Sequence, residues 1–534
     1  MLAVGTAALA GQTTVCTVTV NSADEREVFK QSLPAGRYRF VELLERGRSD
    51  WLASACQQKV RCDVLVVSGH FAGTEFYSSK VDVPESFAVD EMERVACSDS
   101  CPDLFSNLKE VYLFGCDSLK PEPVRSATPE IVRGLMAAGQ SRPDAERFAR
   151  ALSDRHGESS RERMRRVFPN TPVIYGFSSL APYGRVAGPM LARYFQGNGP
   201  DDIGSGRVSP KLLSMFAPSS MVVTAGQRET DANADYRAEA CRFYDDRLST
   251  ADRIRFMHEL LGRDMPQVRV SFDRVEKFFG SLSGIHHEVE ATREAAQDLA
   301  GDPRTRANYL GITRATQDPA LRVRMITLAR SVGWLTPAEH QAELVHAIHD
   351  VLASDAMGFG EVDLVCTLNR DRALDDSLNR LQVSQSHART AQAAALACLG
   401  SADGHARMLK AVASANDADV QIAQAYLRHR PLTESAELRE IVQGIVRIKG
   451  AAAQVRALET LARLHVTDRE VLDELARLFR HSPSLQVQRA IAEVFIRAGN
   501  PAADPAFGAV FRQHRIKSPT GEDLIDVFIR RIPS

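Results

Sequence analysis

Two reactive side chains each follow an apolar run of the same kind. DVLVVSG at 63–69 leads directly into His70, and EVYLFG at 110–115 leads into Cys116. A thiol is only slightly ionised at neutral pH, and a neighbouring imidazole converts it to the thiolate that attacks a carbonyl carbon. The same imidazole can then protonate the leaving amine. His70 and Cys116 are therefore candidates for a catalytic dyad.

Strand-like runs alternate with helical segments over the first part of the chain. One helix is expected near 50–59, and Ser22 with Glu25 has the pattern of a capping box that begins another. Short apolar runs separated by helices are typical of a parallel sheet buried on both faces, so we expect an α/β architecture. Ligands bind beyond the carboxyl ends of such strands, where both reactive side chains would lie. The predicted strands are 15–20, 38–43, 63–68, 111–114, 173–175 and 221–224.

The same segments resemble the motifs of clan CD cysteine peptidases, which include caspases, separases, gingipains and bacterial CHAT domains. In that group one hydrophobic strand ends in His-Gly and a later one ends in a small residue and Cys. Here SGHFAG and LFGCDS stand in that order, with the His and the Cys 46 residues apart. VIYGFSS is similar to the strand that follows the cysteine. The resemblance implies a caspase-like peptidase domain over 13–225, with Cys116 as nucleophile and His70 as general base and acid.

The resemblance further implies an oxyanion hole of backbone N–H groups, to which Gly69, Phe71 and Cys116 would contribute. The family has Gly after its histidine, whereas this chain has Phe71. Phe still carries an N–H, but its backbone has less freedom than that of Gly. The departure weakens the assignment of the oxyanion hole more than that of the dyad.

Substrate-binding residues are expected beside the nucleophile and after the strand at 173–175. In the family that strand is followed by part of the substrate groove. The predicted substrate-binding residues are Asp117, Ser178, Ser179 and Tyr183. The arginine-rich run 161–166 also carries charge that a specificity pocket would use, but we expect it to form the solvated face of a helix.

Composition excludes some classes of function. The chain has 534 residues, more than one hydrophobic core usually serves, so at least two domains are expected. A net charge of -2 gives no reason to propose a nucleic acid or an anionic membrane as partner. No run reaches the roughly 18 apolar residues of a membrane span. No cofactor or metal is implied, because His346 and His349 lack a third ligand.

The cysteines suggest an oxidising compartment. Cys56 with Cys62 and Cys97 with Cys101 are close pairs that could each close a small loop through a disulfide. Cys366 and Cys398 lie in apolar helical surroundings and are expected to be small core residues.

The N-terminal residues also suggest a location in an oxidising compartment. Residues 2–10 resemble the apolar part of a secretory signal, although its basic start is missing, and we interpret 1–12 as a truncated signal remnant. A periplasmic or secreted protein is expected, with a cytoplasmic one as the alternative.

The second half of the sequence has helical patterns only. Polar residues at 226–235 predict a linker, and 236–534 predicts an all-α domain whose repeats are clearest at 385–500. Val420, Val455 and Val487 each open an alanine- and leucine-rich helix, at spacings of 35 and 32 residues. Such periods indicate stacked helix pairs, and two of these segments resemble HEAT-type repeats.

Two hypotheses follow for the whole chain. The first is a bacterial-style cysteine endopeptidase that cleaves a protein or peptide substrate, with the helical repeats binding a protein partner. The second is a non-catalytic interaction protein in which both domains bind and neither cleaves. Acyl transfer from the same thiolate to an acceptor other than water is a third and weaker one.

Overall fold

The structure is a computed structural model, and its residues fall into two compact units. One unit comprises Met1–Thr316 with Ser331–Trp334, and the other comprises Gln317–Arg330 with Leu335–Ser534. The predicted linker at 226–235 thus falls inside the first unit. The structure describes residues 12–20, 23–43, 52–78, 85–98, 101–123, 128–156, 158–197, 199–231, 233–282, 290–354, 357–375, 389–432, 434–518, 521 and 523–532.

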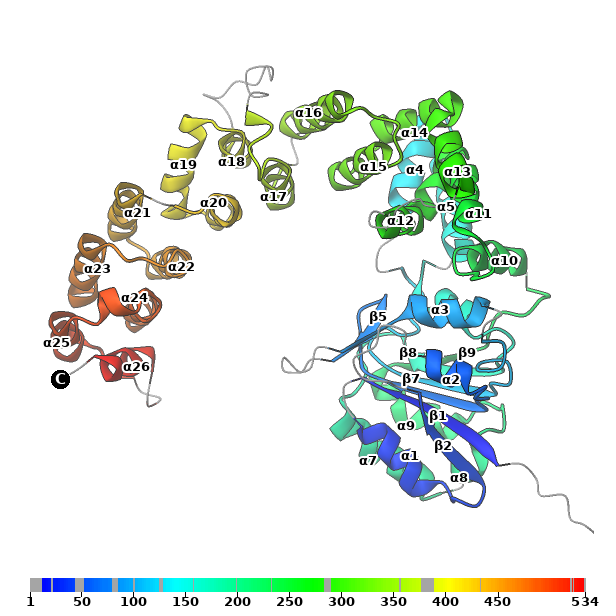
Figure 1. Ribbon diagram of the computed structural model, residues 1–534. Helices are drawn as coiled ribbons and strands as arrows, with labels where there is room; N and C mark the ends of the chain where they lie inside the picture. The colour runs from blue at the N-terminus through cyan, green and yellow to red at the C-terminus, as the bar shows by residue number, and fades with distance from the viewer. Residues whose placement is uncertain are drawn as a thin grey trace, which may run out of the picture. The chain divides into compact units, whose positions relative to one another are not determined.

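A six-stranded sheet forms the centre of the first unit, with the strand order β2-β1-β3-β7-β8-β9 (Figure 1). Five strands are parallel, and β9 runs antiparallel to β8. All six predicted strands are confirmed, since each lies on one strand of this sheet. The strands are β1 (Thr13–Thr19), β2 (Tyr38–Glu42), β3 (Val64–Ser68), β7 (Glu110–Phe114), β8 (Val173–Phe177) and β9 (Met221–Thr224).

Helices cover both faces of this sheet, as its continuous apolar strands require. Val64 and Val66 of β3 pack with α1, α7 and α9 on one face. Leu65 and Val67 point to the other face, where they pack with α2, α3 and α6. The core around this sheet therefore consists of two apolar layers, one on each side of it. These helices are α1 (Asp24–Ser32), α2 (Ala53–Gln57), α3 (Val89–Cys97), α6 (Ser160–Val167), α7 (Gly184–Phe195) and α9 (Pro210–Phe216).

A second, three-stranded sheet lies beyond the carboxyl end of β3, and the sequence did not predict it. Its strands are β4 (His70–Phe71), β5 (Glu75–Tyr77) and β6 (Ser86–Ala88), which pair antiparallel in the order β4-β5-β6. At two or three residues each, these strands are too short to show an alternating pattern. They place His70 within a strand rather than in a loop.

Among the described residues, every element after β9 is a helix, and further helices lie between β7 and β9. In the first unit the hairpin of α4 and α5 packs on α12, and α11 contacts α13. Among the described residues, no helix is both long and apolar enough to cross a membrane. The remaining helices of this unit are α4 (Thr128–Ala137), α5 (Arg142–His156), α8 (Gly199–Asp202), α10 (Ala234–Arg242), α11 (Thr250–Leu261), α12 (Met265–Leu282), α13 (Glu290–Gly301) and α14 (Pro303–Ala315).

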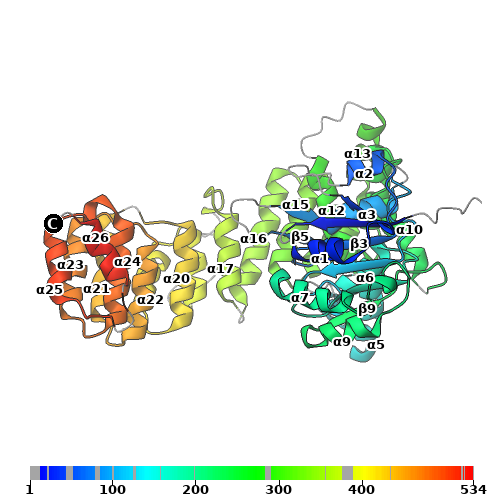
Figure 2. The same cartoon turned by 90° about the horizontal axis from the view of Figure 1, so that it is seen from below.

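The second unit is a stack of helix pairs in two rows (Figures 1 and 2). In one row α18, α20, α22, α24 and α26 follow one another, and in the other row α19, α21, α23 and α25 do. The helices are α15 (Pro319–Ser331), α16 (Pro337–Ala353), α17 (Phe359–Leu368), α18 (Thr390–Cys398), α19 (Ala402–Val412), α20 (Asp417–His429), α21 (Ser435–Arg447), α22 (Ala451–Ala462), α23 (Arg469–His481), α24 (Leu485–Ala498), α25 (Pro505–His514) and α26 (Leu524–Arg531).

The predicted repeat corresponds to every second helix of this stack. Val420, Val455 and Val487 lie on α20, α22 and α24, which are consecutive members of one row. A recurring hydrogen bond marks the structural period more sharply. Gln454 donates to the Ile445 carbonyl at 3.0 Å, and 34 residues later Gln488 donates to the Phe479 carbonyl at 3.1 Å. Each bond ties one helix to the end of the preceding helix.

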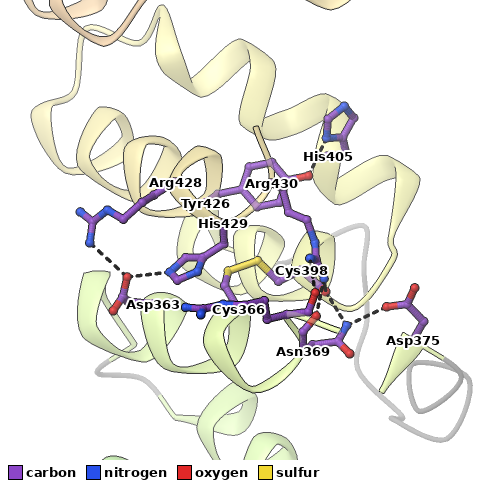
Figure 3. The surroundings of a disulfide bond; sticks show 11 residues. Asp363, Cys366, Asn369, Asp375, Cys398, His405, Tyr426, Arg428, His429 and Arg430 are labelled. Atoms are coloured by element: carbon purple, nitrogen blue, oxygen red, sulfur yellow. Dashed lines mark hydrogen bonds and ion pairs between the residues drawn. A yellow bond between two sulfur atoms is a disulfide. The ribbon is translucent and has the colours of Figure 1, made fainter. Parts of the chain in front are cut away.

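A disulfide joins α17 to α18 in this unit (Figure 3). Cys366 and Cys398 are both fully buried, as predicted, but they are also bonded to each other. Asn369 donates to Asp375 and to the Cys398 carbonyl, each at 2.7 Å, and Arg430 donates to the same carbonyl at 3.1 Å. The sequence did not predict the bond, because the two cysteines are 32 residues apart.

Candidate functional site

His70 and Cys116 lie at the same edge of the central sheet. Strands β3 and β7 are parallel neighbours, with Ser68 opposite Phe114. The backbone ladder continues one residue further, since the Gly69 N–H donates to the Phe114 carbonyl at 3.1 Å. His70 and Cys116 each follow two residues after the paired Ser68 and Phe114. Since neighbouring strands lie roughly 4.8 Å apart, the two residues start from adjacent positions of the sheet.

His70 is half-buried and contacts two tyrosine rings. It pairs with Tyr77 of β5, and their ring centroids lie 5.4 Å apart. The ring of Tyr183 meets the His70 ring edge-on at 6.3 Å. Tyr183 comes from the segment after β8, so that segment reaches over to the histidine.

Cys116 contacts the same segment. Its Sγ accepts a hydrogen bond from the Ala181 N–H at 3.3 Å. An N–H donor at this position would stabilise negative charge on the sulfur. Both members of the predicted dyad therefore contact residues 181–183, although His70 lies in β4 and Cys116 in the turn after β7.

Cys116 is also the single free thiol of the chain. All nine cysteines lie among the described residues, and eight of them form four disulfides. Cys116 is half-buried rather than enclosed in the core. Most free cysteines in proteins are buried in the core and unreactive. Cys116 differs from them, because its thiol is half-exposed and stays unpaired although the chain forms four disulfides.

The predicted oxyanion donors differ in availability. The Gly69 N–H already donates to Phe114, so it is engaged within the sheet. The Ala72 N–H donates to the Glu75 carbonyl at 3.1 Å, which makes these two residues a hydrogen-bonded pair of the β4–β5 ladder. Such pairs alternate along an antiparallel ladder, so Phe71, opposite Phe76, turns its N–H away from β5. The Phe71 N–H is therefore not used in this ladder.

Close packing explains why the residue before Cys116 is as small as Gly115. A Cβ built at this position would lie 2.8 Å from the Phe71 Cβ and 3.1 Å from the Gly69 carbonyl oxygen. The turn that carries Cys116 thus packs directly on the segment that carries His70. Any larger residue at 115 would push the two segments apart.

The turn after Cys116 is held by a serine that the sequence did not single out. Ser118 is fully buried, donates to the Leu113 carbonyl at 3.2 Å and accepts from the Phe177 N–H at 3.1 Å. It thereby joins the turn that carries Cys116 to β7 and β8. A serine two residues after the cysteine is too common in sequences to be recognised as such a support.

Asp117, one of the predicted binding residues, has a left-handed backbone with φ at 58°. Its N–H donates to the Ser179 carbonyl at 2.7 Å, and its carboxylate lies 3.6 Å from the Lys120 ammonium. The residue therefore shapes the turn and pairs with a neighbour. Its carboxylate keeps some exposure beside Cys116, so it can still meet a ligand.

The three predicted binding residues after β8 have different positions. The Ser178 hydroxyl donates to the Ser220 carbonyl at 3.3 Å, which anchors it to the fold. Ser179 is exposed, and its carbonyl holds Asp117. Tyr183 is 65% exposed, and Leu180 beside it is 74% exposed. This segment thus presents apolar side chains to solvent next to His70 and Cys116.

A buried carboxyl lies under the end of β3. Glu25 of α1 is 3% exposed, and burial raises its pKa to about 7. Perturbed acids of this kind gather at functional sites, although structural networks produce them too. The predicted capping box of Ser22 and Glu25 is wrong, because α1 begins at Asp24 with Ala23 as its N-cap and no side-chain cap bond; Ser22 itself lies outside the described residues.

The predicted local disulfides are wrong in their pairing. Cys56 bonds to Cys101 rather than to Cys62, and Cys62 bonds to Cys16 of β1. The four cysteines share the apolar layer that contains α2 and α3. The folded layer brings together residues distant in sequence, which spacing alone does not reveal.

The third disulfide of the first unit is also long-range. Cys97 bonds to Cys241 of α10, across 144 residues, instead of to Cys101. Cys97 closes α3, and α10 packs against that helix. The bond therefore ties the first helix after the sheet back onto the α/β layer.

The arginine run at 161–166 is not a solvated face. Arg166 is 6% exposed, and Arg163 donates to Glu93 at 2.8 Å and to Asp90 at 2.5 Å. Nearby cations hold the pKa of the Glu93 carboxyl well below its usual range, against the effect of its burial. The run therefore serves an internal ion cluster between α3 and α6.

The described residues contain no candidate metal site, since no three of their His, Cys, Asp or Glu side chains lie close enough together to hold an ion. His286, His287 and Glu288, whose spacing does not suit a zinc peptidase, lie outside the described residues.

Comparisons with known proteins assign no family. No protein-family model matches the chain, and no curated protein matches it. The crystal structure of an engineered protein aligns over 83% of this chain and 93% of its own, at 13% identity and a TM-score of 0.21. A TM-score this low carries no argument. The chain is therefore described by its architecture, a mostly parallel α/β sheet domain followed by a long all-helical region of stacked helix pairs.

Proposed function

We propose that this chain is a caspase-like cysteine endopeptidase whose HEAT-like helical repeats bind a protein partner or substrate. One observation supports this most. The only free thiol of the chain lies two residues beyond β7, at the position matching that of His70 beyond β3. A thiol and an imidazole at one edge of a parallel sheet are what nucleophilic amide cleavage needs.

The chemistry would proceed in two steps. His70 takes the proton of the Cys116 thiol, and the thiolate sulfur bonds to the carbonyl carbon of the scissile amide. The C–N bond then breaks, and the leaving nitrogen takes the proton from His70. His70 next removes a proton from water, whose oxygen attacks the thioester and releases the acid and the thiol. The N–H groups of Phe71 and Cys116 would stabilise the oxyanion in both steps.

The alternative is a non-catalytic scaffold with the same architecture. The engaged Gly69 N–H favours it, because one of the predicted oxyanion donors is used within the sheet. Phe71 in place of Gly favours it as well, because its backbone has less freedom to direct its N–H toward an oxyanion. The four disulfides are typical of oxidising compartments, and we propose a periplasmic or secreted location on that ground.

Labelling with an acyloxymethylketone peptide probe tests the proposal. The native chain should be labelled at Cys116, and Cys116→Ala should abolish the labelling. His70→Ala should slow the reaction by about 100-fold, the low end of what a general base contributes. If Cys116 reacts no faster in the native chain than in the denatured chain, or if His70→Ala leaves the rate unchanged, the scaffold alternative is correct. If the labelling results agree with the proposal, analysis of the reaction products distinguishes hydrolysis from acyl transfer.

A further inference from the structure

Three segments of the second unit carry basic residues and no acidic ones. They are 441–458, 475–492 and 505–521, and each contains three Arg or Lys residues but no Asp or Glu. The whole chain has a net charge of -2, so this separation of charge is local. Each segment contains the end of one helix in the row of α21, α23 and α25, together with the connection that follows it (Figure 1).

The three helices of this row run in the same direction. Arg439, in the first half of α21, donates to Asp468, the N-cap of α23, at 3.0 Å. Arg469, the first residue of α23, donates to Asp504, the N-cap of α25, at 2.5 Å. The beginnings of neighbouring helices are thus bonded to each other. Their basic ends must therefore lie together at the opposite edge of the row.

A glutamine at the start of α24 joins two of these ends directly. The Gln488 Nε2 donates to the Phe479 carbonyl in the last turn of α23 at 3.1 Å and to the carbonyl of His514, the last residue of α25, at 3.0 Å. The Gln488 Oε1 accepts from the Ile516 N–H at 2.8 Å. The ends of α23 and α25 are therefore held side by side.

Most of the cations in these segments have no acidic partner. Those that form ion pairs are Arg456, Arg477, Arg489 and Arg515. The others are exposed, form no ion pair with any residue that the structure describes, and lie in the last turn of a helix of the row or in the connection after it. We call them the basic stripe, and its members are Arg447, Lys449, Arg480, Arg512 and Lys517. Like charges gathered in this way favour the approach of an anionic partner.

The spacing of the helices sets the form of a partner that follows the stripe. Packed helices lie about 8 to 10 Å apart, and an extended chain advances about 3.3 Å per residue. About three residues of an extended peptide therefore pass each helix end, and about seven residues cross the whole stripe. Alternate side chains of an extended peptide point to the same side. Acidic side chains on that side would meet the cations of successive helices.

The three basic segments lack the exposed side chains by which nucleic acids and membranes are commonly bound. They contain no Trp or Tyr, none of their leucines is exposed, and their phenylalanines are buried, namely Phe479, Phe507 and Phe511. Bases of single-stranded nucleic acid stack on exposed aromatic rings. Helices that lie on membranes combine basic residues with exposed Trp, Phe or Leu. Carboxylates need neither, so the stripe fits an acidic peptide best.

We propose that the basic stripe binds an extended acidic segment of a partner protein, whose Asp or Glu side chains pair with its cations. The inference rests on the partner-binding part of the proposed function and does not need the peptidase part. An Arg side chain can hold a carboxylate through two parallel N–H groups. Each exposed ion pair contributes little, so the affinity depends on several pairs formed together. Salt screens such pairs and lowers the affinity.

Fluorescence anisotropy with the full chain carrying Cys116→Ala tests this binding without cleavage of the probe. The probe is a fluorescein-labelled peptide of alternating Glu and Ser, about ten residues long so that it crosses the stripe. The control peptide has Gln in place of each Glu. We expect saturable binding of the Glu peptide, an affinity that falls as the salt concentration rises, and binding of the Gln peptide that is weaker by about tenfold or more.

Two matched double variants locate the binding. Arg447→Glu combined with Arg480→Glu reverses two charges of the stripe and should weaken binding of the Glu peptide by about tenfold or more. Arg370→Glu combined with Arg463→Glu makes the same change of charge at exposed positions of the other edge. Arg463 ends α22, which begins where α21 ends, and the Arg370 carbonyl accepts from Arg430 at the end of α20. This control should bind the peptide like the parent chain.

The proposal is overturned if the Glu and Gln peptides bind equally, if reversing the charges of the stripe leaves the affinity unchanged, or if both double variants lower it equally. It is also overturned if single-stranded DNA, or vesicles of phosphatidylcholine with phosphatidylserine, bind more tightly than the Glu peptide and lose this binding in the stripe variant, because the stripe then serves another anion. None of these outcomes changes the labelling of Cys116, so the peptidase part of the proposed function is tested separately.

Discussion

Gly115 lies so close to Phe71 that a side chain at position 115 would meet the Phe71 Cβ at 2.8 Å. These residues are the immediate neighbours of Cys116 and His70. The relative position of the two reactive groups therefore depends on a backbone contact, and not only on the strands before them.

Replacing Gly115 with Ala should separate these two segments. The added methyl group also meets Phe76 Cε1 at 2.9 Å, so neighbouring atoms have to move. We expect a loss of about 1 to 3 kcal/mol in the free energy of unfolding, typical of overpacking, together with slower alkylation of Cys116. Urea unfolding and iodoacetamide kinetics measure the two effects.

Gly311→Ala is the matched control for Gly115→Ala. Gly311 lies exposed on α14, and a Cβ there meets nothing within 4 Å. Helix propensity predicts a gain of about 0.5 to 1 kcal/mol at such a site. If both substitutions have the same effect, the contact between Gly115 and Phe71 does not constrain the site.

Ser118→Ala removes the side chain that holds the turn carrying Cys116. The Phe177 N–H then loses its partner in a buried position, and the Leu113 carbonyl loses the hydroxyl that donates to it. We expect a loss of about 1 to 3 kcal/mol in the free energy of unfolding, the cost of an unsatisfied buried group. Urea unfolding provides the measurement. Ser281→Ala, at an exposed position where the hydroxyl donates within its own helix, should change stability by less than about 0.5 kcal/mol.

The strands of the main sheet were predictable because each is a short apolar run with a clear boundary. The helix rows were predictable for a similar reason, since alanine- and leucine-rich segments recur at nearly constant spacing. The antiparallel direction of β9 was not, because its four residues carry no signal of direction. The short strands β4, β5 and β6 depend on tertiary contacts, among them the packing of Phe71 on Phe76 at 4.7 Å between ring centroids.

The candidate site was predictable in part. Residue type and strand-end position pointed to His70 and Cys116, and the structure brings these positions to neighbouring strands. Sequence could not show that the Gly69 N–H is engaged by Phe114, because that depends on the register of β3 and β7.

Peptide mapping of the unreduced chain should find four long-range disulfides and one free thiol. Cys16–Cys62, Cys56–Cys101, Cys97–Cys241 and Cys366–Cys398 are the expected bonds. Mass spectrometry after alkylation without reduction should place the label on Cys116 alone. A Cys56–Cys62 or Cys97–Cys101 bond in the native chain would contradict the packing of the layer that holds α2 and α3.

Glu25 should make the stability of the chain depend on pH. Its pKa is about 7 in the folded state against 4.5 in the unfolded state, because burial disfavours the charged form. The folded state therefore holds this proton more tightly. The resulting stabilisation is complete below pH 4.5 and is lost as the pH rises through about 7.

Glu25→Gln removes this titration. Between pH 4.5 and pH 8 the variant should gain about 3 kcal/mol in the free energy of unfolding relative to the parent chain, since each unit of pKa difference corresponds to about 1.4 kcal/mol. Urea unfolding of both chains across this range measures the difference. A constant difference between them would mean that Glu25 titrates alike in the folded and unfolded states, and that its burial is relieved by water or by movement of α1.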